Sequence, residues 1–346
     1  AGPLQFQNPN RAAIAASTEA ARDLGAAGSM PDIRPIAEQL TVRWLRTRLS
    51  EKKIGPAWAG DVTGWRVMNI AAAAPILLAG KDGRHRAKLL DHLAECEAHI
   101  ARSGDKAPRG RAQIVGAAGG VAAALLLTRS RRSRAWHEKR LSRAIRDGIY
   151  PDGGIASRAP MGLFSLAEAL ALLASCYRAR QVPLPDFLDD AQRGLLGAMR
   201  SLIHGDGGTA SWQGAAPLPA ARLETLIAAS RVVPRARADV RHWGYQRLTA
   251  GKSVLLMDAA PPPGADQAEA GCASTLAVEF SSGSERIFVS CGGGALVGAH
   301  ISADLAKGLR STAAHSTLCL DNANSTAVLP RGGLGAGVDT VDCDVR

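Results

Sequence analysis

The chain has 346 residues, of which 46% are hydrophobic and 4% aromatic, and its formal net charge is +11. This length exceeds one usual domain, and the hydrophobic fraction is too high for a disordered chain, so we expect two domains with a sizeable core. The charge-free apolar runs 70–80 and 115–127 are both too short to span a membrane. The chain begins Ala-Gly-Pro-Leu, without the basic-then-apolar pattern of a secretion signal, so we expect no signal peptide in it.

The charge is concentrated in the first part of the chain. Residues 1–240 carry 34 Lys and Arg against 21 Asp and Glu, a net charge of +13, whereas residues 241–346 carry −2. A basic region of this size favours a polyanionic partner, whether a nucleic acid, an acidic polysaccharide or an anionic membrane surface. The alternative is arginine on solvated helix faces. The six cysteines show no CxxC and no metal-ligand spacing, so no metal site is predicted and a reducing or disulfide-poor compartment is favoured.

Helical periodicity dominates up to about residue 240. Apolar spacing and chain breakers predict helices over 11–24, 33–52, 63–79, 84–102, 111–128, 134–147, 161–180 and 187–203. Beyond residue 240, β-rich runs separated by Pro and Gly predict strands of an antiparallel sheet over 253–257, 275–280, 286–290 and 316–320.

The connections between the predicted helices alternate in length. Short ones fall near 80–83, 129–133 and 182–186, and longer ones near 54–61, 103–110, 148–160 and 204–217. In an array of antiparallel helices, alternate loops lie at the same end, and long loops on a rigid frame are where sites are built. Two of the long loops contain an Asp-Gly-Gly sequence, at 152–154 and 206–208. We therefore expect both loops at one functional end of a helical toroid or solenoid.

Several residues of these long loops have the chemistry of a sugar-binding site. Trp65, Arg66 and Asn69 begin a helix and offer a ring, a cation and an amide, although a core Trp beside a surface Arg is the alternative. Arg158 follows the first Asp-Gly-Gly sequence and is suited to hold a carboxylate, the alternative being a capped structural loop. 

The second Asp-Gly-Gly loop adds His204, Trp212 and Gln213. Trp212 is a candidate sugar platform, and the alternative is a buried Trp that seals the helices. Gln213 is suited to bond sugar hydroxyls.

Two further candidates lie outside these loops. His315 opens the predicted strand 316–320, where a lone His is more often structural than catalytic, and Arg310 upstream is a candidate anion partner. The cluster 129–134 contains four arginines, but it falls at the short-loop end, which favours a solvated connection over a polyanion site.

Five segments in order along the chain resemble one family. Residues 152–160 are similar to the DGG-x-x-[ST]-R-x-P loop of the heparinase II/III-like proteins, especially their alphaproteobacterial members, and 204–214 to the DGG-x-A-x-[FW]-x-G element that follows. Residues 309–318 match the family segment LRST-A-A-HST-L, and 63–66 and 244–258 resemble its early helix motif and the start of its β-domain.

The resemblance implies a multidomain α+β fold. It consists of an N-terminal incomplete (α/α) toroid over 1–240, followed by an antiparallel β-sandwich domain that begins at 241. Four or five strands before Arg346 leave sheet edges exposed, so we expect the β-sandwich to be truncated in this chain.

The family's enzymes are polysaccharide lyases, which cleave next to a uronic acid by β-elimination. By resemblance, His315 is the active-site histidine of the β-domain, Arg158 and Gln213 neutralise the substrate carboxylate, and His204 is an acid/base candidate. The remaining candidates, which would bind the sugar chain, are Trp65, Arg66, Asn69, Trp212 and Arg310.

The chain departs from the family at positions that carry chemistry. Where family lyases have Asn or His, in or just after the first loop, this chain has Ile155, Ala159 and Leu163, and the expected catalytic Tyr has only Tyr150, Tyr177 and Tyr245 as candidates. Two hypotheses therefore stay open: a lyase acting on an acidic polysaccharide, and a catalytically lapsed member that binds polyanions or acts as a scaffold. Nucleic acid is the least favoured partner. 

The remaining expectations are broad. The protein is expected in the periplasm or cytoplasm of a bacterium, without a membrane span. The sequence requires no cofactor, leaves room for a structural divalent metal in the β-domain, and does not indicate an oligomeric state.

Overall fold

The computed structural model describes residues 56–78, 83–104, 107–237, 240–265, 267–268, 271–293, 301–329 and 333–344, together with 39 and 41. Apart from the first two residues, the chain divides into two compact units that alternate in sequence. The first comprises Pro3–Ile145 and Ala169–Leu188, and the second comprises Arg146–Glu168 and Asp189–Arg346. The predicted helices 11–24 and 33–52 lie outside the described residues except for positions 39 and 41.

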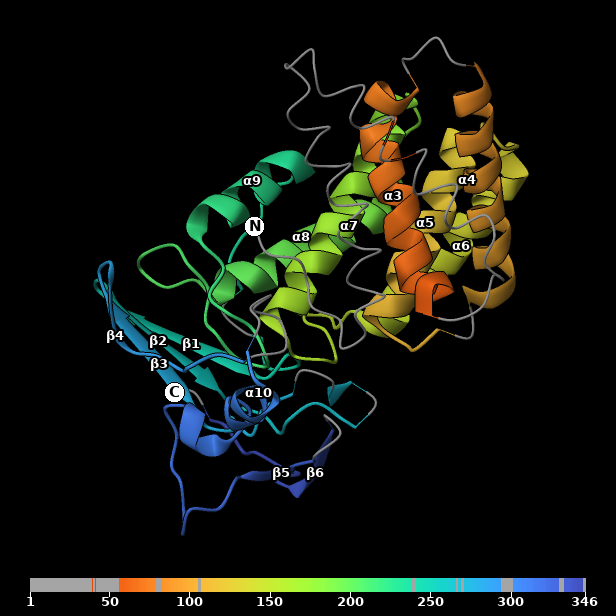
Figure 1. Ribbon diagram of the computed structural model, residues 1–346. Helices are drawn as coiled ribbons and strands as arrows, with labels where there is room; N and C mark the ends of the chain where they lie inside the picture. The colour runs from red at the N-terminus through yellow and green to blue at the C-terminus, as the bar shows by residue number, and fades with distance from the viewer. Residues whose placement is uncertain are drawn as a thin grey trace. The chain divides into compact units, whose positions relative to one another are not determined.

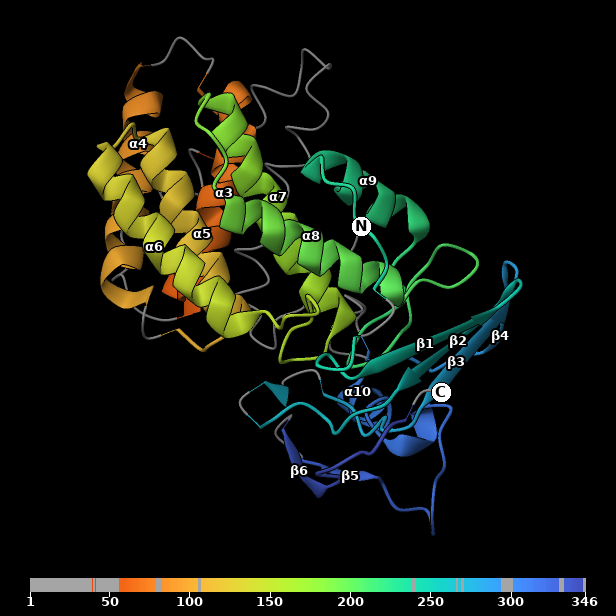
Figure 2. The same cartoon turned by 180° about the vertical axis from the view of Figure 1, so that it is seen from behind.

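Four helices in the described part of the first unit confirm the predicted periodicity. They are α3 (Gly60–Leu77), α4 (Gly83–Ser103), α5 (Arg111–Leu126) and α6 (Arg131–Gly148), preceded by the short 3₁₀ helix η1 (Pro56–Trp58). α5 is apolar nearly all round and lies in the core, whereas α6 is strongly polar and lies on the outside of the group, nearest the viewer in Figure 2.

Glycines allow α3 and α5 to approach closely. A Cβ atom on Gly64 would lie 2.3 Å from the carbonyl oxygen of Val115, and one on Gly119 would lie 2.4 Å from the Cα of Gly64. The two backbones are therefore in direct contact, which a larger side chain at either glycine would prevent.

The helix α7 (Pro160–Ala179) starts in the second unit and continues into the first. Its face of Leu163, Leu166, Leu170 and Leu173 is fully buried, as the three-and-four spacing predicts. Among the described helices α7 alone is long and apolar enough to cross a membrane, but 72% of its apolar window is buried within the protein, as in a core helix.

The second unit combines helices with antiparallel strands (Figure 1). Its helices are most of α8 (Asp186–Ser201), then α9 (Ala220–Ser230), which the sequence analysis missed, and the short α10 (Ala303–Gly308). The strands β1 (Tyr245–Ala250), β2 (Ser253–Asp258), β3 (Val278–Ser282) and β4 (Glu285–Phe288) form one sheet in chain order. A separate hairpin pairs β5 (Thr326–Val328) with β6 (Leu334–Gly337).

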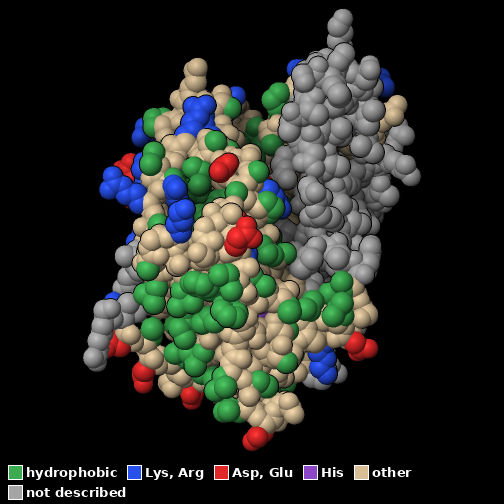
Figure 3. Space-filling view, turned by 90° about the vertical axis from the view of Figure 1, so that its left-hand side faces the viewer, with side chains coloured by type: hydrophobic (Ala, Val, Ile, Leu, Met, Phe, Trp, Pro, Cys, Tyr) green, Lys and Arg blue, Asp and Glu red, His purple; other side chains and the backbone are tan. Residues whose placement is uncertain are grey.

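The four-stranded sheet buries charged residues on one face and shows apolar residues on the other. Asp258 on β2 and Glu279 on β3 are fully buried, whereas Phe280 is half-buried and Phe288 is 57% exposed. The rings of these two phenylalanines lie 6.4 Å apart on the outer face. Figure 3, which views the molecule from the β4 side, shows hydrophobic side chains gathered over this part of the surface.

The predicted strands are confirmed at 253–257, 275–280 and 286–290, with shifts of up to three residues. The prediction of a strand at 316–320 is wrong, because this segment is irregular and makes only one isolated bridge, Leu320 to Ala323. Its backbone bonds are spread over separate partners, such as Val278, whose N–H donates to the carbonyl of Ser316.

The predicted multidomain α+β fold class, with helices followed by antiparallel strands, is confirmed. A domain boundary at residue 240 stays a prediction.

Gly64→Ala tests the close approach of α3 and α5. Alanine favours a helix by about 1 kcal/mol over glycine, but its Cβ clashes with the α5 backbone, so we expect a net destabilisation of about 2 kcal/mol or more. Gly83→Ala is the matched control, because nothing lies within 4 Å of a Cβ there. Urea denaturation measures both, and equal stability of the two variants would contradict the close packing.

Candidate functional site

The two Asp-Gly-Gly loops fold into the same turn. The Oδ1 of Asp152 accepts from the N–H of Gly154 at 2.9 Å, and the Oδ1 of Asp206 accepts from the N–H of Gly208 at 2.9 Å. The glycine after each aspartate has a positive φ, of 86° and 79°. Both loops belong to the second unit: Asp152 of the first accepts from the N–H of Trp243, just before β1, and Ser211 of the second donates to Glu279 on β3.

The first loop ends at Arg158, whose guanidinium is completely engaged by the protein. All five N–H groups donate, to the carbonyls of Trp243, Gly244, Ala260 and Pro261 and to the Oδ1 of Asp258. Burial opposes ionisation of Arg158, but the carboxylate of Asp258 outweighs it and raises the pKa of Arg158 above its ordinary value. In this conformation Arg158 has no donor left for a substrate carboxylate, so the geometry does not support its predicted catalytic role.

The second loop brings Gln213 to the same carboxylate. Its Nε2 donates to the Oδ2 of Asp258 at 3.2 Å and to the Oγ of Ser274 at 3.0 Å, and its Oε1 accepts from the N–H of Cys272 at 2.9 Å. Gln213 is 1% exposed. Like Arg158 it has a positive φ, of 51° against 53°. Gln213 therefore holds Asp258 from the other side, and its amide is not directed to a sugar.

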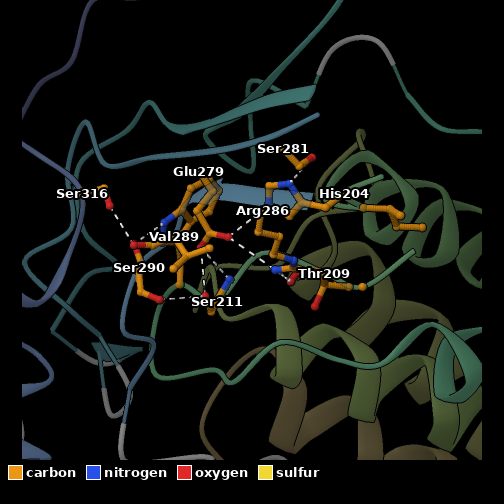
Figure 4. A network of polar contacts seen from close by, with 12 residues as sticks. His204, Thr209, Ser211, Glu279, Ser281, Arg286, Val289, Ser290 and Ser316 are labelled. Carbon is orange, nitrogen blue, oxygen red and sulfur yellow. Dashed lines mark hydrogen bonds and ion pairs between the residues drawn. The ribbon is translucent and has the colours of Figure 1, made fainter. Parts of the chain in front are cut away.

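A second buried carboxylate, that of Glu279, contacts residues of the second loop (Figure 4). The Nε2 of His204 lies 3.0 Å from the Oε2 of Glu279, and both the N–H and the hydroxyl of Ser211 donate to its Oε1 at 2.9 Å. The Nδ1 of His204 lies 3.0 Å from the hydroxyl of Ser281. Because the side chains of His204 and Glu279 are both 0% exposed, this pair is placed to hold the loop rather than to meet a substrate.

Arg286 closes this network at the surface. It pairs with Asp206 through its Nε at 2.8 Å and lies 3.7 Å from Glu279 through its Nη1. The hydrogen bonds of Arg286 lower the pKa of Asp206 below its ordinary value.

Trp212 lies in the core and offers no platform for a sugar. It is 0% exposed, its Nε1 donates to the Oγ of Ser290 at 3.1 Å, and its ring stacks on Tyr245 at 5.0 Å between centroids. The alternative of a buried Trp is therefore the correct one.

His315 is buried at 7% exposure and has an unusual environment. Neither ring nitrogen has a hydrogen-bond partner among the described residues. The backbone holds it on both sides, since Cys291 donates to the carbonyl of Ala314 and Val278 donates to that of Ser316. Burial lowers the pKa of His315 below its ordinary value, against smaller opposing effects of Asp258 and Glu279. The neutral imidazole of His315 is thus favoured, next to the two buried carboxylates.

The other two arginines among the predicted binding residues donate to backbone carbonyls of the protein. Arg310 donates through Nε to the carbonyl of Gly271 at 2.6 Å and through Nη2 to that of Ala268 at 3.3 Å. In the first unit, Arg66 is 2% exposed, donates to the carbonyl of Ala57 at 2.6 Å and lies over the ring of Trp58. Trp65 is half-buried.

Asn69 is 2% exposed, and its Oδ1 has no partner among the described residues. The burial of Arg66 and Asn69 favours a structural role for them over contact with a ligand.

The tyrosines differ sharply in exposure. Tyr177 donates to Glu138, and Tyr245 donates to the carbonyl of Arg158, and burial raises the pKa of both above the ordinary range. Tyr150 is 37% exposed and stands at the start of the first Asp-Gly-Gly loop. No group of three or more His, Cys, Asp or Glu in the described part of the chain is arranged to hold a metal ion.

Asp258 and Glu279, which organise the site, were not among the residues predicted from the sequence. The available signal was a single acid within or at the end of an apolar strand, in Val-Leu-Leu-Met-Asp258 and in Leu-Ala-Val-Glu279-Phe. An acid in such a strand must lie at the surface or be paired inside.

Comparisons with known proteins agree with the fold. Residues 232–346 match the profile of a family described as "Heparinase II/III-like, C-terminal". The fold matches a crystal structure of heparinase III with a TM-score of 0.67 at 13% identity, over 93% of this chain and 56% of that one. It also matches the heparan sulfate lyase HepC from Pedobacter heparinus with a TM-score of 0.57 at 14% identity, over 89% of this chain and 53% of the other. No curated protein sequence matches the chain. The chain thus spans just over half the length of these solved structures.

A double-mutant cycle tests the pair of Arg158 and Asp258. Arg158→Met leaves a buried carboxylate without its cation and should cost about 3–5 kcal/mol of unfolding free energy. The double variant Arg158→Met with Asp258→Asn should lose less unfolding free energy than the sum of the losses in the two single variants, with a coupling of about 1–3 kcal/mol. The exposed pair Asp189 and Arg193, 2.8 Å apart, is the control, and its coupling should stay below about 0.5 kcal/mol. Additive costs at Arg158 and Asp258 would refute the pairing.

The lowered pKa of His315 predicts a pH dependence of stability. The unfolded chain binds a proton at residue 315 more readily than the folded chain does. The free energy of unfolding is therefore highest above about pH 6.5, the pKa of an unfolded histidine, and decreases as the pH falls from there through the lower pKa of folded His315. Chemical denaturation at a series of pH values should show a weaker loss below pH ~6.5 in His315→Gln than in the wild type. His242→Gln, at an exposed histidine, should follow the wild type. Parallel curves for all three proteins would exclude the effect.

Proposed function

We propose that this chain, a heparinase II/III-like family protein, is a polysaccharide lyase that cleaves a uronic-acid-containing acidic polysaccharide by β-elimination. The observation that supports it most is His315, a buried imidazole that has no hydrogen-bond partner among the residues that the structure describes and whose lowered pKa favours the free base. A base that removes a weakly acidic carbon-bound proton must be neutral at working pH and must have an unoccupied nitrogen. The helical part would form the frame of an incomplete toroid.

The reaction would proceed through residues of the second unit. His315 takes the C5 proton of the uronate, the electron pair forms the C4–C5 double bond, and the C4–O bond breaks. The leaving sugar oxygen must then receive a proton, and the exposed phenol of Tyr150 is the tyrosine suited to supply it. Asp258 and Glu279 would act indirectly, because their charges favour the imidazolium that His315 becomes.

Arg158 and Gln213 then act as positioning residues. They hold Asp258, whose charge acts on His315, and their donors bond to the protein instead of making the substrate contact that the family resemblance implies. 

The engagement of these hydrogen-bond donors within the protein favours a second candidate function. A chain whose Arg158 and Gln213 donors are all engaged is suited to a catalytically lapsed member that binds an acidic polysaccharide without cleaving it.

An absorbance assay for the unsaturated uronate product, over a panel of acidic polysaccharides, separates the two functions. We expect product with the wild type and a loss of at least about 10³-fold in kcat/KM for His315→Ala. His85→Ala is the control, because His85 is equally buried at 7% and its two ring nitrogens also lack a hydrogen-bond partner within the described part of the chain, but His85 lies on α4 of the first unit. Binding without product on every polysaccharide would overturn the lyase in favour of the binding member.

A further inference from the structure

The exposed side of α6 carries three cations and one aromatic ring. Arg132, Trp136, Lys139 and Arg143 are all exposed and follow one another at spacings of four, three and four residues. Such spacing places them on one side of the helix, over a length of about 16 Å at 1.5 Å per residue. We call these four residues the basic stripe.

The charge of α6 is large for a single helix. Residues 131–148 contain seven Lys and Arg and two Asp and Glu, a net charge of +5 against +11 for the whole chain. The first turn of α6 has no acidic residue but contains three arginines. These cations lie at the positive end of the helix dipole, where like charge is unfavourable and an anion is stabilised.

The acid in the middle of the helix does not offset the stripe. Glu138 accepts from Arg134 at 3.2 Å and from the hydroxyl of Tyr177 at 2.7 Å, and is half-buried. The other acid, Asp147, follows the stripe at the end of the helix.

Trp136 is exposed although it is among the most apolar side chains. It is 47% exposed, and the guanidinium of Arg140 lies 4.7 Å from the centre of its ring. A ring held in place by a cation at the surface offers an apolar face for a pyranose ring, while the cations beside it bind carboxylate or sulfate groups.

We propose that the basic stripe of α6 is a binding surface for an extended acidic polysaccharide, in addition to the candidate site in the second unit. The choice of polysaccharide rests on the proposed function. A nucleic acid fits less well, since single-strand binding surfaces stack successive bases on several aromatic rings and the stripe offers one.

Binding to fluorescently labelled heparan sulfate, measured by anisotropy as salt is raised, tests the stripe. Arg132→Ala with Lys139→Ala should weaken binding about fivefold or more and lower the salt slope by about 1–2. Arg84→Ala with Lys88→Ala on α4 removes the same charge from two exposed positions of another helix and should change binding less than about twofold. Trp136→Ala should weaken binding with an unchanged salt slope, and thermal unfolding of each variant checks that it is folded.

Equal losses for the two double variants would overturn the proposal, because binding would then follow net charge alone. No loss for the stripe variant, or a larger loss for single-stranded DNA than for the polysaccharide, would also overturn it. Because binding is measured directly, the test holds even if no polysaccharide is cleaved. Cleavage of a short oligosaccharide, which should be unchanged in the stripe variant, tests the proposed function separately.

Discussion

Two carboxylates buried inside the second unit determine how its parts fit together. A buried charge is costly unless it is paired and fully hydrogen-bonded, so Asp258 and Glu279 require partners from outside their own strands. The Asp-Gly-Gly loops supply these partners from residues up to 100 positions away: Arg158 and Gln213 for Asp258, and His204 and Ser211 for Glu279. The sheet and the loops are thereby fixed to each other, and His315 lies among groups whose positions are already determined.

The two loops use one turn for different purposes. The capped aspartate and the positive-φ glycine are common to both, as is a later residue with φ near 50°. Beyond the turn, the first loop provides a cation and the second provides an amide and a hydroxyl, while His204, just before the second turn, provides an imidazole. The same backbone turn thus carries different side chains in the two loops, and together these side chains supply the partners of Asp258 and Glu279.

Local patterns predicted the parts that depend on neighbours in sequence. The spacing of Leu163, Leu166 and Leu170 identified α7, and the repeated Asp-Gly-Gly sequences identified two equivalent loops. The role of Arg158 was not predictable in this way, because its partners are set by the fold and lie beyond residue 240. Trp212 shows the same limit: a loop Trp has the same sequence signature whether it packs on Tyr245 or faces solvent.

The four-stranded sheet, which buries its acids and exposes apolar side chains, also affects how the protein's unfolding can be measured. With its acids turned inward, the sheet leaves the apolar side chains of Phe280 and Phe288 on its outer face, and Ile287 in the edge strand β4 is also exposed. Contiguous apolar surface of this kind attracts other apolar molecules. A hydrophobic dye will therefore fluoresce on the folded chain, so a dye-monitored melt begins from a high baseline, and intrinsic tryptophan emission is the better probe of its unfolding.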